Sequence, residues 1–198
     1  MPTLQTAIID HLRPTQLTIG KIEVDEKRKK LAALTAKDQV KFLQDHPMPV
    51  VVGPEQALYI TDHHHLARAA LEAKVTTGCF VVEADLSKLS LEDFWEDMDK
   101  NLWVHPLDEN GVRRRYASIP RHLKDLVDDV YRSLAGYVRD AGGYEKTKTA
   151  FAEFIWADYF RRNVAIEDVR ANFGDAVKVA LRLARSPHAK GIPGFIDK

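Results

Sequence analysis

The apolar residues change their spacing near residue 90, and this change limits the fold more than any other feature of the sequence. Before it, short apolar runs rich in β-branched and aromatic residues, as at 50–52, 58–61 and 76–83, are typical of strands. After it, Ser90 and Asp93 form a capping box, and apolar residues recur at helical spacings. The spacing therefore predicts an α+β protein, with an α/β domain over residues 1–89 and a helical domain packed on it over residues 90–198.

A junction between an expected strand and an expected helix lies at residues 58–70, LYITDHHHLARAA. Leu66 and Ala69 fall at helical spacing after the apolar run 58–60, so a helix should start at Asp62 or just after it, with Asp62 as its N-cap. The start of a helix carries unpaired backbone N–H groups and the positive end of the helix dipole. The junction therefore predicts a phosphate-binding turn, within a β-α-β unit completed by the strand at 76–83.

Three other expectations follow from the apolar pattern outside this junction. In the first domain it predicts a strand over residues 6–12 and helices over 24–34 and 36–45. In the second it predicts a helix that starts with Pro120 at its first position and continues to residue 138. It also predicts helices over 151–159 and 166–184.

The histidines of the junction leave three alternatives open. Helical spacing places Asp62 beside His65 and His64 beside Arg68. Successive histidines cannot share one metal ion, because their directions differ by about 100°. Asp62 and His65 are the candidate metal ligands, although the sequence has no HxxxH, CxxC or HExxH pattern to complete a site. A solvated polar turn without any ligand is the third alternative.

The composition narrows the class of protein. The 198 residues are 45% hydrophobic, which excludes a disordered chain. Lys plus Arg and Asp plus Glu each total 29, so no general attraction to nucleic acid is expected. Cys79 is the only cysteine, and its apolar neighbours predict a buried, inert strand position. Without a signal-like N-terminus or an 18-residue apolar stretch, we expect a soluble cytoplasmic protein with no membrane partner.

Two parts of the sequence carry a family resemblance. The first is the apolar run 49–52 followed by 59–61 and DHHHLARAA, and the second is the long segment 119–162. Together they resemble the ParB and sulfiredoxin superfamily and, over nearly the whole chain, a bacterial ParB-like family described as nucleases. In the motif of this superfamily, Asp62 occupies the position of the acid. His63 occupies the position of the usual glycine, and a residue other than glycine makes a positive backbone φ less expected there. The resemblance implies a fold with a small mixed sheet and helices. It also implies that the protein binds or reacts with a phosphate-containing ligand.

The resemblance also implies roles for particular residues. The phosphate- or nucleotide-binding residues would be His63, His64, His65, Arg68 and Lys21. The catalytic residues would be Glu23, Asp62 and His64, because Glu23 looks like the catalytic acid of ADP-dependent serine kinases of this fold. An acid in the first turn of a helix is also explained by the helix dipole alone.

These features predict a ParB-like nuclease or phosphoryl-transfer protein that binds a nucleotide or phosphodiester. A nucleotide such as ATP, ADP or CTP and a divalent ion, Mg²⁺ or Mn²⁺, are the expected ligands. Two alternatives stay open: a nucleotide-dependent kinase of a small hydroxyl metabolite, and a non-catalytic nucleotide- or partner-binding module. The zero net charge does not support nucleic acid as the partner.

Overall fold

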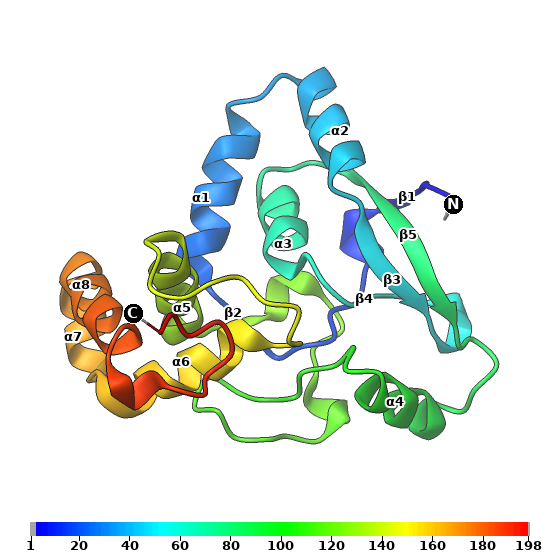
Figure 1. The fold of residues 1–198 in the computed structure, drawn as a ribbon. Helices are drawn as coiled ribbons and strands as arrows, with labels where there is room; N and C mark the ends of the chain where they lie inside the picture. The colour runs from blue at the N-terminus through cyan, green and yellow to red at the C-terminus, as the bar shows by residue number, and fades with distance from the viewer. Residues whose placement is uncertain (1–2, 198) are drawn as a thin grey trace. The chain divides into compact units, whose positions relative to one another are not determined.

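The computed structural model describes residues 3–197, which form two compact units (Figure 1). Unit 1 contains residues 3–19 and 24–127, and unit 2 contains residues 20–23 and 128–197. The predicted boundary at residue 89 therefore falls inside unit 1. The reason is that α4 (Leu91–Lys100) packs its buried Phe94 and Met98 with Val51 and Tyr59.

The sheet of unit 1 is mixed, and its strand order in the described residues is β1-β5-β3-β4. Its strands are β1 (Gln5–Ile8), β5 (Thr77–Asp85), β3 (Met48–Val52) and β4 (Leu58–Ile60). The parallel pair is β3 and β5, which lie side by side in Figure 1, whereas β4 is antiparallel to β3. The predicted β-α-β unit is therefore wrong, because the helix after β4 leads to a strand that runs the opposite way and is not its neighbour.

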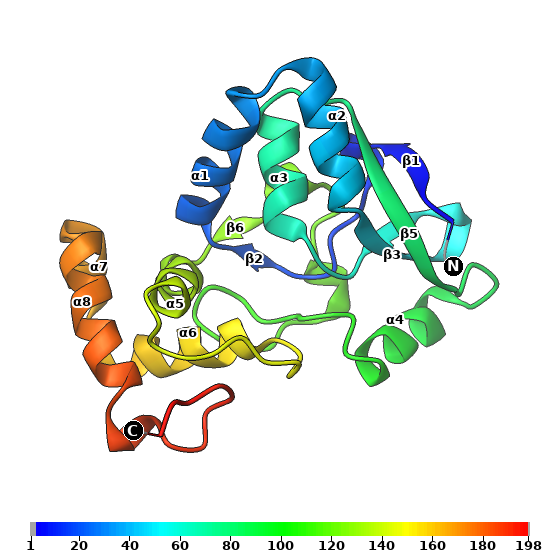
Figure 2. The same ribbon diagram turned by 45° about the horizontal axis from the view of Figure 1, so that its top comes forward.

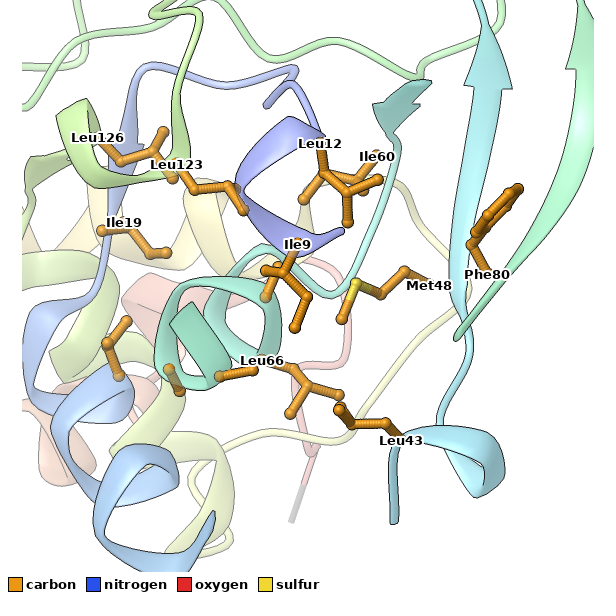
Figure 3. Packing of buried hydrophobic residues seen from close by; sticks show 14 of the residues in the cluster. Ile9, Leu12, Ile19, Leu43, Met48, Ile60, Leu66, Phe80, Leu123 and Leu126 are labelled. Atoms are coloured by element: carbon orange, nitrogen blue, oxygen red, sulfur yellow. The ribbon is translucent and has the colours of Figure 1, made fainter. Parts of the chain in front are cut away.

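The core of unit 1 gathers apolar residues from elements far apart in the sequence. Figure 3 shows Ile9, Met48, Leu66 and Leu43 close together. Burial of each such side chain contributes about 1.5–3 kcal/mol. Their elements include α2 (Ala36–Asp45), found as predicted, and α3 (His64–Glu72). The predicted strand over 6–12 ends early, at Ile8, because the next three residues form a 3-10 turn that buries Ile9.

The segment after Pro120 differs from its prediction. In place of a helix start, the structure has a 3-10 turn at Leu123–Asp125 and then a strand, β6 (Val127–Asp128). β6 pairs with β2 (Thr18–Ile19), as Figure 2 shows. The helix is prevented from starting here because Leu123 and Leu126 are buried in the core of unit 1.

Unit 2 is mainly helical. Its helices are α5 (Val130–Asp140), α6 (Ala152–Asn163), α7 (Ile166–Ala171) and α8 (Phe173–Ala184), together with the first turn, residues 21–23, of α1 (Lys21–Ala32). The predicted helix over 166–184 is divided at Asn172, whose side chain accepts the Asp175 N–H and starts α8. The α+β class is confirmed. No helix in residues 3–197 has the length and apolar character needed to cross a membrane.

Candidate functional site

The predicted phosphate-binding turn joins β4 to α3 in unit 1. The helix starts at His64 and its N-cap is His63, so the prediction of Asp62 as N-cap is wrong. Asp62 Oδ1 instead accepts the backbone N–H of His63 at 2.6 Å. On the strand side, the Thr61 N–H donates to the Pro49 carbonyl at 3.0 Å, and the Thr61 hydroxyl donates to Glu83 at 2.6 Å. These bonds fix the backbone at the point where the strand ends.

His63 has a left-handed backbone, with φ 64° and ψ 22°. The positive φ that the family motif assigns to glycine is therefore kept by a histidine, one of the residues that tolerate it best. A left-handed residue followed by a right-handed helix directs successive N–H groups toward one side, a geometry that favours anions. The dipole of α3 adds to this preference. The His63 N–H is already used by Asp62 Oδ1, and binding of a phosphate by the remaining N–H groups of the turn stays a prediction.

The side chains of the turn have different surroundings. Asp62 is exposed, while His63 and His65 are half-buried. His63 Nδ1 is shielded from solvent and has no hydrogen-bond partner among the described residues. A buried polar atom without a partner is costly, and because His63 Nδ1 is shielded from solvent, a ligand could contact it only after the side chain moves.

His64 is held inside unit 1. Its Nε2 accepts the backbone N–H of Thr15 at 3.1 Å and lies 3.3 Å from the Thr15 hydroxyl, which donates to the Ile60 carbonyl at 2.8 Å. An accepting Nε2 assigns the proton to Nδ1 and makes the imidazole neutral. His64 thus ties the first turn of α3 to the loop at Thr15, and its catalytic role stays a prediction. This contact has no sequence signal, because 49 positions separate the two residues.

Arg68 is held by groups of unit 1. Its Nε donates to Glu72 Oε1 at 2.6 Å, and one terminal nitrogen donates to the Leu123 carbonyl at 2.7 Å. The guanidinium is therefore already paired with a carboxylate four residues further along α3. A role for Arg68 in phosphate binding stays a prediction, and it would require sharing the guanidinium with Glu72.

Glu23 belongs to unit 2, where its carboxylate accepts a hydrogen bond from Arg132 at 2.8 Å. The two side chains are 13% and 10% exposed, so this is a largely buried ion pair. A Cβ atom at position 136 would lie only 2.2 Å from Glu23 Oε1, which explains why Gly136 faces this carboxylate. The action of Glu23 on the same ligand as the histidine turn stays a prediction.

The start of α1, which includes Lys21, is also anchored inside unit 2. The Lys21 N–H donates to Asp128 Oδ1 at 2.9 Å, and the Ile22 N–H donates to the Ser133 hydroxyl at 3.2 Å. These backbone donors of α1 are therefore satisfied by protein groups. Any phosphate contact by Lys21 would have to come from its side chain, and it stays a prediction.

The described residues do not form a metal centre by themselves. No group of three or more His, Cys, Asp or Glu side chains within residues 3–197 is arranged to hold a metal ion. Asp62 and His65 would therefore need water molecules and phosphate oxygens to complete a coordination shell, as Mg²⁺ sites often have. Cys79 is buried on β5, as predicted, and burial raises the pKa of its thiol, so it is not a reactive nucleophile.

Comparison with known proteins identifies the family. A family model described as "Putative ParB-like nuclease" matches residues 5–162. The chain belongs to this ParB-like family. A search of solved structures found protein Atu1540 from Agrobacterium tumefaciens, which is 40% identical and has a TM-score of 0.93. That match covers 99% of this chain and 97% of the other. The match to the family model confirms the resemblance seen in the sequence.

A second solved structure is much less similar. It is the C-terminally truncated chromosome-partitioning protein ParB from Caulobacter crescentus, complexed with CTP-gamma-S, at 13% identity and a TM-score of 0.33. The match covers 92% of this chain and 97% of that one, but at this TM-score nothing follows from it. The comparison with curated proteins found no match.

Proposed function

We propose that this ParB-like protein binds the phosphate of a nucleotide or phosphodiester at the turn of residues 61–65 and hydrolyses a phosphodiester bond there. The observation that carries the proposal is the left-handed His63 at the start of α3, a backbone geometry that favours anion binding by successive N–H groups. The family description as a nuclease agrees with this chemistry. His63 Nδ1 adds a polar group without a protein partner among the described residues.

The chain's own residues can be assigned to the steps of a hydrolysis. The backbone N–H groups at the start of α3 would stabilise the charge on the phosphoryl oxygens. Asp62 Oδ1 is occupied by the His63 N–H, which leaves Oδ2 to take a proton from the attacking water. As the water oxygen bonds to phosphorus, the ester P–O bond breaks, and His65 would supply a proton to the leaving oxygen. Asp62 and His65 are also the residues that would hold a divalent ion. In that case the ion would supply the positive charge and activate the attacking water in place of their acid and base roles, because a ligating carboxylate and imidazole do not also transfer protons.

Binding without turnover is the second candidate function, and one observation favours it. Two of the residues predicted to act in catalysis are engaged by the protein: His64 by Thr15 and Glu23 by Arg132. The kinase alternative depends on Glu23 as the base, and Arg132 would have to release it. Asp62 is therefore the residue on which a hydrolytic function depends most.

Calorimetry and a cleavage assay test both candidates at low salt, with Mg²⁺, Mn²⁺ or neither. The probes are ATP, ADP, CTP and short single-stranded oligonucleotides. Asp62→Asn should retain phosphate binding and lose cleavage by at least about a hundredfold, which corresponds to about 2.7 kcal/mol. Glu92→Gln, an exposed acid on α4, is the matched control and should behave as the wild type.

His63→Gly separates the backbone of the turn from the imidazole. Glycine keeps the positive φ without strain, so folding should be unaffected, and any loss of binding is due to the side chain. Binding without cleavage by the wild-type protein would select the non-catalytic alternative. Absence of binding by every phosphate probe would end both proposals.

A further inference from the structure

A hollow of about 410 Å³ lies at the C-terminal end of α3, within unit 1. Its volume is in the range of sites for small molecules. None of residues 61–65 lines it, so it is separate from the phosphate-binding turn. Its lining combines apolar and charged side chains: Ile8, Asp10, Arg68, Leu71, Glu72, Lys74, Val75, Thr76 and Lys124.

Lys74 is an unusual residue for its position in the backbone. It follows the C-cap of α3 with φ 61°, its N–H donates to the Leu71 carbonyl at 3.0 Å, and the next N–H, of Val75, donates to the Ala70 carbonyl at 2.9 Å. This is the Schellman arrangement, in which the left-handed residue is usually glycine. A lysine is strained there, and Leu102 occupies the same arrangement after α4 with φ 59°. The strain alone therefore does not assign a ligand to Lys74, but it predicts that glycine fits this backbone position better.

The charges of the hollow favour an anion. Lys74 and Lys124 are exposed and form no ion pair within the described residues, whereas Arg68 and Glu72 pair with each other. Asp10 is the one lining acid besides Glu72 and is also exposed. The lining therefore has two ammonium groups and one carboxylate outside the Arg68–Glu72 pair, and Asp10 can accept a hydrogen bond from a hydroxyl or amine.

The apolar part of the lining favours a ligand with an apolar body. Leu71 and Val75 are half-buried, and Ile8 is 51% exposed although it is a large hydrophobic residue. An organic ligand that covers these side chains removes their apolar surface from water, which stabilises the complex. An inorganic anion has no apolar surface and does not provide this stabilisation. From the two sets of contacts together, we propose that the hollow binds a small organic acid, a carboxylate or phosphate ester, with an aromatic or aliphatic body.

The test compares four probes by calorimetry and by amide chemical shifts at low salt. Phenyl phosphate and benzoate carry both features, inorganic phosphate carries only the charge, and benzyl alcohol only the apolar body. At least one of the first two should bind at least about ten times more tightly than both of the others, with shifts at residues 71–76. Equal binding by inorganic phosphate or by benzyl alcohol would overturn the proposal.

Lys74→Gly distinguishes a ligand contact from a structural role. Glycine relieves the left-handed strain, so this variant should melt at or above the wild-type temperature while its dissociation constant rises about tenfold or more. Lys124→Gln should weaken binding similarly, and Lys37→Gln, an exposed lysine on α2, should not. Unchanged binding by Lys74→Gly and Lys124→Gln would refute the assignment. Asp62→Asn should bind these probes normally, so failure here and failure of the phosphate-binding turn can be told apart.

Discussion

Replacing His64 by alanine tests whether this histidine is a structural residue. His64 is 5% exposed and Thr15 is 1% exposed, so alanine would leave the Thr15 N–H buried without its acceptor. An unsatisfied buried donor costs about 1–3 kcal/mol. The cavity left by the imidazole adds to this cost, so we expect His64→Ala to lose about 2–4 kcal/mol of the free energy of unfolding of unit 1.

His64→Gln is the matched variant, because its side-chain oxygen can reach the position of Nε2 and accept the Thr15 N–H. It should lose less than about 1.5 kcal/mol. Hydrogen exchange measured by mass spectrometry resolves the two units, so the loss should appear in α3 and the Thr15 loop and leave α5 to α8 unchanged.

Activity per folded molecule decides between the structural and the catalytic role. If His64 only holds the turn, His64→Gln should bind phosphate ligands and cleave them about as well as the wild type. A His64→Gln protein that is stable but inactive would refute this structural interpretation. A His64→Ala protein as stable as the wild type would show that the Thr15 contact is not important for the fold.

Three further predictions concern unit 2. Gly136→Ala should destabilise it by about 1–3 kcal/mol in urea unfolding, because the new Cβ would displace the Glu23 carboxylate. Glu23→Gln should lose about 3–5 kcal/mol by leaving Arg132 charged and largely buried, whereas replacing Glu23 and Arg132 together with apolar residues should recover most of it. Burial raises the pKa of Asp129 against the opposing effect of Arg161, so the folded state holds its proton more tightly than the unfolded chain. The contribution of Asp129 to the free energy of unfolding should then fall as the pH rises through the folded pKa. Asp129→Asn should remove this pH dependence from the free energy of unfolding measured between acid and neutral pH.

Two of the helices that the sequence predicts, α2 and α4, have short-range start signals. Thr35 and Ser90 each accept the N–H of the residue three positions later, so the information for α2 and α4 lies within one turn of sequence. Asn172 caps α8 in the same way, but the apolar residues of 166–184 keep a helical spacing across it. The break between α7 and α8 is therefore not visible in the apolar pattern. Local capping chemistry is therefore the part of this fold that the sequence reveals best.

The failures come from contacts between distant positions. The sequence after Pro120 has a good helix-start signal. Leu123 and Leu126 are nevertheless buried in the core of unit 1, and their burial prevents this segment from forming a long helix. The partner of Glu23 lies 109 positions away, and nothing near Glu23 indicates it. The junction of strand and helix at the histidines is found where the sequence predicts it, because a change of apolar spacing is a local signal. The partner of His64 is not predictable in this way, because it is distant in the sequence.

The histidine turn has few charged side chains that could attract an anion, and this limits the ligands that it can bind. Formal charges balance over the whole chain, and Arg68, the cation expected beside the turn, is paired with Glu72. A phosphate at the turn would then be held mainly by backbone N–H groups and the dipole of α3, which do not depend on a cluster of lysines. Such a site binds one phosphate group by shape, whereas a protein that grips a long nucleic acid must neutralise many phosphates. If the proposed site binds phosphate, we therefore expect it to prefer a short or mononucleotide-sized ligand over duplex DNA.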